Sequence, residues 1–134
     1  MTLAANALQK AIYDRLSDAL DPVEVYDHIP QGTAFPYVVI GADSSVAWDD
    51  KTADGQEFTC TVHAWDALKA GRKSVKQVMQ DVYAALHRRE EALSLPGLME
   101  CRCEYAETFQ EAASESNADQ YYHAVMRFRF MIQP

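Results

Sequence analysis

The sequence has few of the features that mark secreted or membrane-spanning proteins. It contains three cysteines in 134 residues, and none has the spacing of a CxxC pair or a metal-ligand set. No run approaches the roughly 20 apolar residues that cross a bilayer. The N-terminus, MTLAANALQKAIYDRL, lacks the basic patch and uninterrupted apolar stretch of a signal peptide. We therefore expect a cytoplasmic protein whose cysteines are reduced and buried.

Positive charge is also scarce. The chain has 12 Lys and Arg residues against 20 Asp and Glu residues, and its formal net charge is −8. Proteins that bind duplex DNA tightly use clustered lysine and arginine. The two basic stretches, KAGRKSVK (69–76) and HRR (87–89), flank a predicted helix and are typical of a solvated helix face. The composition therefore argues against tight, direct binding to a DNA duplex.

The common catalytic and cofactor motifs are missing as well. The five glycines are scattered over turns and element ends, and the sequence holds no phosphate-binding loop, GxSxG, HExxH or EF-hand pattern. The four histidines lie on four different predicted elements, without ligand spacing between any two. The carboxylates are spread over loops and polar faces and define no acid–base pair. We therefore predict a protein without catalytic residues, cofactor or bound metal.

The sequence does contain clear periodic patterns. Apolar residues recur every three or four positions over about 2–20, and again from a start within 67–73 to about 89, which predicts two amphipathic helices. Asp54-Gly55 is a typical turn of a β-hairpin. Five stretches have the pattern of strands, at 24–29, 37–48, 57–65, 98–109 and 121–132.

The element order is therefore αβββαββ, in a single domain that spans residues 1–134. Two helices have to bury their apolar stripes on the one apolar face of a sheet. This predicts an α+β fold, a two-layer sandwich in which a mainly antiparallel sheet of about five strands carries both helices on one face.

The last two strands are expected to form an antiparallel hairpin. Side chains alternate between the two faces of a strand, so the apolar side of the first of these strands should carry Met99, Cys101, Cys103 and Tyr105. On the polar side, acids of one strand should face arginines of the other, with each pair contributing about 0.2–1 kcal/mol. The pairs predicted are those of Glu100 and Glu104 with Arg127 and Arg129.

Several aromatic residues fall outside the core pattern. Trp65 lies on the polar side of its strand, Trp48 at a strand end and Phe35 in the loop QGTAF. Exposed aromatics are enriched at protein interfaces, although they also cover second faces of sheets. The polar loops 49–56 and 110–120 are further candidates for reaching a partner. The predicted contact residues are Phe35, Trp48, Asp54, Gly55, Trp65, Glu115 and Asn117.

Four stretches of the chain resemble a known family. ALQKAIYDRL, VYDHIPQGTAFPYVVIG, DGQEFTCTVHAWD and GRKSVKQVMQDVYAAL together resemble the tail-completion family of tailed bacteriophages, which also occurs in prophages and gene transfer agents. The resemblance runs from Leu3 to about Ile132. It implies a small subunit that forms a ring, typically a hexamer, at the head-proximal end of a tail tube. Such a ring terminates tail polymerisation and joins the tail to the head.

The same resemblance implies the partners and the location. The partners are further copies of the chain, the tail-tube protein and the head connector or adaptor protein, and the location is the virion after assembly in the bacterial cytoplasm. DNA passes through the ring without tight binding, which a net negative charge favours, and no membrane takes part. The family offers no catalytic residues to transfer.

Two alternatives stay open at this point. The chain could be another virion part, either a tail-tube subunit or a connector adaptor. It could also be a small ligand-binding or hydrolase domain, and the sign of this would be a deep pocket that gathers His63, His123 and carboxylates with shifted pKa values.

Overall fold

The computed structural model describes residues 3–28, 34–49, 54–112 and 120–133. Within these ranges lie two long helices, α1 (Ala5–Leu20) and α2 (Gly71–Leu86), and two single 3-10 turns, η1 (Leu68–Ala70) and η2 (Glu90–Ala92). The strands are β1 (Glu24–Tyr26), β2 (Tyr37–Ala47), β3 (Gln56–Ala67), β4 (Leu98–Ala112) and β5 (Gln120–Ile132). The predicted order αβββαββ is confirmed.

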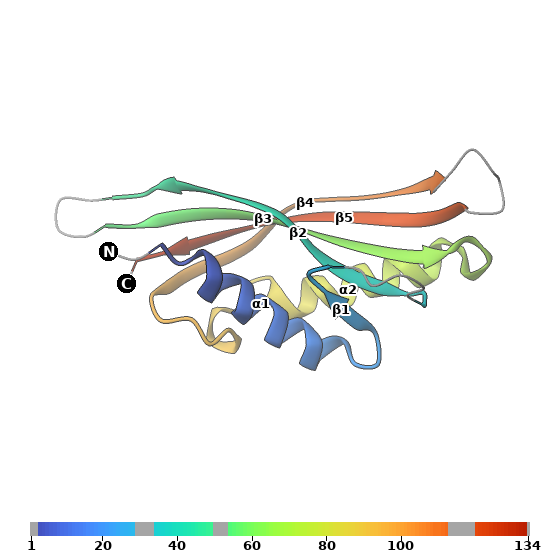
Figure 1. Ribbon diagram of the computed structural model, residues 1–134, viewed down its shortest axis with the longest axis horizontal. Coiled ribbons are helices and arrows are strands. Elements are labelled where there is room, and N and C mark those ends of the chain that lie inside the picture. The colour runs from blue at the N-terminus through green and yellow to red at the C-terminus, as the bar shows by residue number, and fades with distance from the viewer. Residues whose placement is uncertain (1–2, 29–33, 50–53, 113–119, 134) are drawn as a thin grey trace.

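The strands form one sheet in the order β1-β2-β3-β5-β4. β1 runs parallel to β2, and the other neighbouring strands are antiparallel. Figure 1 shows α1 and α2 together on one side of this sheet. We call this side the helix face and the opposite side the outer face. The predicted two-layer α+β sandwich is confirmed.

The core lies between the helices and the helix face. Each helix buries residues three or four positions apart: Leu8, Ile12 and Leu16 in α1, and Val75, Val78 and Val82 in α2. These stripes meet alternate residues of β3 and β5, among which Phe58, Phe128 and Phe130 are almost completely buried. Burying an apolar side chain of this size contributes about 1.5–3 kcal/mol to the stability of the fold. The apolar periodicities of the helices and strands therefore also hold the two layers together.

The cysteines belong to this core. Cys60 and Cys101 are buried and all three thiols are free. Burial raises the pKa of the Cys60 thiol to about 12 and raises that of Cys101 further still. Both thiols therefore stay protonated and pack as small apolar groups, as predicted. Cys103, which was also predicted to be buried, is only half-buried at the edge of the core.

The prediction for β4 was wrong at two positions. Met99 and Tyr105 were expected on the apolar side, but they are 55% and 45% exposed. The pairing of β4 with β5 shifts by one residue between Leu98 and Glu100, and again between Cys103 and Tyr105. Each extra residue moves the following side chains to the other face of the sheet, and simple alternation cannot anticipate such a shift.

The ion pairs across the last hairpin form only in part as predicted. Glu104 lies 3.7 Å from Arg127 Nε and 3.8 Å from Arg129 Nη1. Arg129 has a shorter contact on its other side, where its Nε lies 2.8 Å from Glu57 of β3. Glu100 pairs with Arg88 and Arg102 instead.

The predicted loop 110–120 is also shorter than expected, because β4 extends to Ala112 and β5 starts at Gln120.

The helices give no sign of a membrane segment. In the part of the chain that the structure describes, neither α1 nor α2 has the length and hydropathy to cross a bilayer.

Candidate assembly surfaces

The outer face carries a connected group of aromatic rings at one end of the sheet. We call this group the aromatic patch. The rings of Tyr37 and Trp65 stack at 5.5 Å between centroids, and Trp65 and His123 at 4.3 Å. Such stacked pairs stabilise a surface beyond the area they bury. The members of the patch are Phe35, Tyr37, His63, Trp65, Phe109, Tyr121 and His123.

Strand register explains why these rings meet. Val62 and Ala64 of β3 point into the core, so His63 and Trp65 point to the outer face. Trp65 pairs with Tyr37 on β2 and with His123 on β5, which places the three rings in one row across the sheet. The predicted position of Trp65 on the side away from the helices is thus what the structure shows.

Within the patch, two histidines and one carboxylate form a hydrogen-bonded chain. His63 Nδ1 lies 2.8 Å from His123 Nε2, and His123 Nδ1 lies 2.8 Å from Glu111 Oε2. Burial lowers the pKa of His63, the charge of His123 lowers it further, and Glu111 acts in the opposite direction. Two nitrogens this close need one donor and one acceptor, so the pair disfavours the state in which both rings are protonated.

A glycine makes room for this pair. A Cβ atom on Gly41 would lie 2.7 Å from His63 Nε2 and 3.1 Å from the carbonyl oxygen of Thr61. The His63 ring therefore lies against the bare backbone of β2. In the sequence, Gly41 is just a glycine within a strand pattern.

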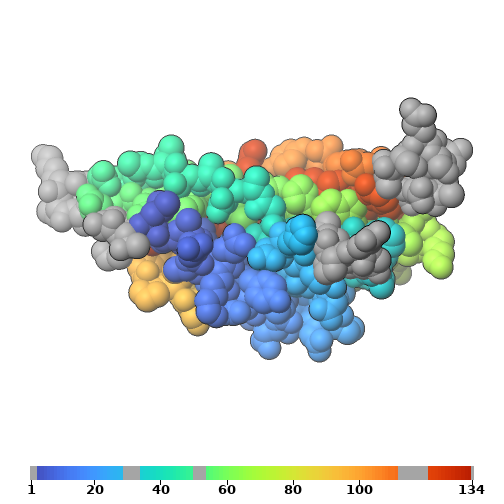
Figure 2. All heavy atoms as spheres, in the orientation of Figure 1, coloured from blue at the N-terminus to red at the C-terminus, as the bar shows by residue number. Residues whose placement is uncertain are grey.

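The other end of the sheet is a projecting hairpin. We call residues 42–49 and 54–57 the β2–β3 arm. Figure 1 shows the arm extending past the start of α1, and Figure 2 shows its surface in the same view. Every residue from Ala42 to Asp49 is exposed. This end of β2 therefore lacks the helical cover that buries Val38 and Ile40.

Three of the predicted contact residues lie together on the arm. The Trp48 amide donates a hydrogen bond to the Gly55 carbonyl at 2.8 Å, and the Gly55 amide donates one to Asp49 Oδ1 at 2.9 Å. A Cβ atom on Gly55 would lie only 1.9 Å from the Trp48 carbonyl oxygen, so this close approach requires glycine. Asp54 is exposed beside it.

The predicted contact residues therefore fall into two groups at opposite ends of the sheet. Phe35 and Trp65 belong to the aromatic patch, while Trp48, Asp54 and Gly55 belong to the arm. Glu115 and Asn117 lie outside the described residues, as do positions 31–33 of the loop QGTAF. Sequence reasoning named His63, His123 and carboxylates only as the group that a hydrolase pocket would gather. The structure joins both histidines to Glu111 on the outer face, away from the hollow beside α1.

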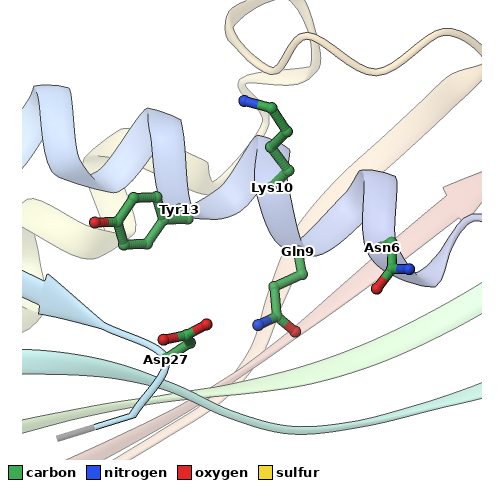
Figure 3. Close-up of a pocket in the computed structure, with 5 residues that line it drawn as sticks. All are labelled: Asn6, Gln9, Lys10, Tyr13 and Asp27. Carbon is green, nitrogen blue, oxygen red and sulfur yellow. The ribbon is translucent and has the colours of Figure 1, made fainter.

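A separate hollow of about 400 Å³ lies beside α1. Asn6, Gln9, Lys10, Tyr13 and Asp27 line it, and Figure 3 shows Gln9 on the side of Asp27 while Lys10 points away. The Lys10 ammonium pairs with Asp14 at 2.7 Å. This hollow contains neither histidine of the patch. Among the described residues, no group of three or more His, Cys, Asp or Glu side chains could hold a metal ion.

These features define a class of protein. A two-layer subunit with exposed aromatic groups at both ends of its sheet is typical of proteins that work by assembly. The chain belongs to the family of tail completion protein gp17, whose model matches residues 3–133. The resemblance seen in the sequence is confirmed.

Two relatives illustrate the family and the fold. Tail completion protein gp17 of Bacillus phage SPP1 is 33% identical over 67 residues, which cover 47% of this chain and 50% of that protein. In this match the chain spans about half the length of the curated relative. A chain from the virion of a native gene transfer agent particle has the same fold, with a TM-score of 0.75 and 24% identity over 100% of both chains.

Proposed function

We propose that this chain is a structural part of a phage-type tail, where it forms a ring at the head-proximal end of the tube. The ring terminates tail polymerisation and joins the tail to the head connector. The observation that carries this proposal is the match of the tail completion family to residues 3–133. The SPP1 relative is named a tail completion protein, and the solved chain of the same fold comes from a virion particle.

The shape of the subunit supports a ring. A closed ring needs a head-to-tail contact between two different surfaces of the same subunit. The aromatic patch and the β2–β3 arm lie at opposite ends of the sheet, so each copy can use one surface for each neighbour. The formal charge of −8 favours a lumen through which DNA moves without being held.

This function requires no reaction centre, and we assign no catalytic residue. The chain of His63, His123 and Glu111 partly resembles the site expected of a hydrolase. It lies on a sheet face among aromatic rings, however, whereas the hollow beside α1 is lined by other residues. Within the described residues, neither histidine is hydrogen-bonded to a serine, threonine or cysteine that could serve as nucleophile.

The test is to remove the gene from the phage or gene transfer agent that carries it and to image the particles. We expect tubes of uncontrolled length and heads without tails, and re-supply of the protein should restore joined particles. Tubes of normal length that still join heads would rule out the proposed role.

Two alternatives within the virion stay open, a connector adaptor and a tail-tube subunit, and the second has a direct test. A tube protein polymerises into long filaments by itself, whereas a terminating ring stays a closed oligomer. Electron microscopy of the purified protein at high concentration distinguishes the two, because filaments would replace the terminator proposal with the tube proposal.

A further inference from the structure

We infer that neighbouring copies in the ring contact each other through the β2–β3 arm of one copy and the opposite end of the next. This inference rests on the proposed function and names the surface through which the ring closes. We call the second surface the docking end; it consists of two rings of the aromatic patch, the exposed Phe35 and the half-buried Trp65, and of the basic residues that follow β3. Its members are Phe35, Trp65, Lys69, Arg72 and Lys73.

The arm presents an unpaired strand edge. β1 pairs with β2 at Tyr37, Val38 and Val39, so within the described chain β2 beyond Gly41 is an edge. Both of its faces are also exposed there, and Val46 is 62% exposed. The β3 side of the arm is anchored, because Gln56 and Glu57 pair with β5. The β2 side has a free edge and two exposed faces, and such an unpaired strand edge favours contact with another chain.

The docking end is built on a fixed corner of the fold. Ala67 pairs with Tyr121, whose ring lies 6.2 Å from that of Phe35, and η1 begins at the next residue, Leu68. The buried Asp66 accepts hydrogen bonds from the Ala67 amide and from the Ser74 hydroxyl of α2. These bonds hold η1 and α2 against the end of β3.

The two surfaces carry opposite charges. Lys69, Lys73 and Lys76 are exposed, and among the described residues no ion pair involves any of them. Asp43 and Asp54 on the arm are equally exposed and equally without an ion pair in the described chain. Complementary charge selects one partner surface over another and fixes its orientation.

The positions of the two surfaces favour a head-to-tail contact between copies over a contact with two-fold symmetry. Figure 1 shows the arm at one end of the long axis and the turn from β3 into α2 at the other. A contact between opposite ends leaves each copy with one arm and one docking end to offer, so it is heterologous and can close a ring. A contact between two arms would instead stop at a dimer. The occupant of the docking end is therefore the arm of a second copy.

The first experiment maps the contact in assembled particles. Carbodiimide couples a carboxylate directly to a lysine that lies against it, and mass spectrometry identifies the joined peptides. Isotope-labelled protein mixed with unlabelled protein before ring assembly separates links between copies from links within one copy. We expect links between copies that join Asp43 or Asp54 to Lys69 or Lys73. Links between two arms, or a complete absence of arm links, would overturn the inference.

The second experiment reverses charge on each surface. Asp43→Lys/Asp54→Lys makes the arm basic, and Lys69→Glu/Lys73→Glu makes the docking end acidic. Each variant alone should lower self-association on the order of tenfold, because attraction becomes repulsion at the same contact. A mixture of the two variants should restore association, since each arm then meets a docking end of opposite charge. Lack of restoration would overturn the inference.

Controls keep the outcomes distinct. Asp18→Lys/Asp21→Lys makes the same change in charge at the end of α1 and should leave association unchanged. Circular dichroism tests whether every variant folds. The Lys73→Glu change should not disturb α2, because an acid in the first turn of a helix is favourable.

Particles that contain the protein at the tail end but give no arm links would refute the inference and leave the proposed function standing. Particles that assemble normally without the protein would refute the proposed function itself.

Discussion

His63 of β3 and His123 of β5 share a hydrogen bond of 2.8 Å between Nδ1 and Nε2, although 60 residues separate them in the chain. His123 is fixed in turn by Glu111, and the ring of His63 rests against Gly41. The histidines are therefore part of the packing of the outer face. They lie within the aromatic patch, which we propose as an assembly surface.

The first prediction concerns pH. Burial and the neighbouring His123 lower the pKa of His63 below its usual value of 6.5. The unfolded chain then takes up a proton more readily than the folded one, so the free energy of unfolding should decrease as the pH falls through 6.5 towards the lower folded pKa. Urea unfolding measured between about pH 7.5 and pH 5 tests this.

The variant His63→Gln should show a weaker dependence of stability on pH over the same range. His28→Gln serves as the control, because His28 is exposed and should leave the dependence unchanged. Equal slopes for the wild type and His63→Gln would contradict the prediction.

The second prediction concerns Gly41. In Gly41→Ala, the new methyl group meets the His63 ring and a backbone carbonyl, so we expect a loss of about 1–3 kcal/mol in the free energy of unfolding. The imidazole NMR signals of both histidines should shift, because His63 has to move. Gly71→Ala is the matched control: its φ of 76° makes it strained, but no atom lies within 4 Å of the added Cβ. It should cost about 1 kcal/mol and leave the histidine signals in place.

The third prediction concerns Gly55. Gly55→Ala forces the Trp48 carbonyl away and breaks the hydrogen bond that joins the two sides of the arm. Amide hydrogen exchange should become faster in residues 42–49 and stay unchanged in β5, since the arm is outside the core. Asp54→Ala removes an exposed side chain next to it and should leave exchange as in the wild type. Unaltered protection of the arm in Gly55→Ala would show that the close approach has no structural importance.

The fourth prediction concerns Phe35. Phe35 and Tyr13 are 43% and 41% exposed, on the docking end and on α1 respectively. Either residue changed to Ser should alter the free energy of unfolding by less than about 1 kcal/mol, because neither belongs to the core. Sedimentation analysis should show weaker self-association for Phe35→Ser alone. If Tyr13→Ser weakened it equally, the contact would include α1.

Most of the layer architecture could be predicted, because it depends on local periodicity. A helix buries every third or fourth residue and a strand every second one, so the stripe of Leu8, Ile12 and Leu16 and the outward position of Trp65 are visible in the sequence. Family-specific stretches of the sequence likewise identified the tail completion family. None of this requires knowing which strands are neighbours.

The tertiary structure alone decided the sites. Periodicity says whether a residue is buried, but not which distant strand lies beside it, so it could not place His123 next to His63. It also assumes unbroken alternation, which the extra residues in β4 interrupt, and Met99 and Tyr105 consequently point to solvent. Glycine is required at positions 41 and 55 because atoms of other residues lie where a Cβ atom would be. The sequence thus determined the elements and their buried sides, and strand pairing over long separations determined the surfaces that they present.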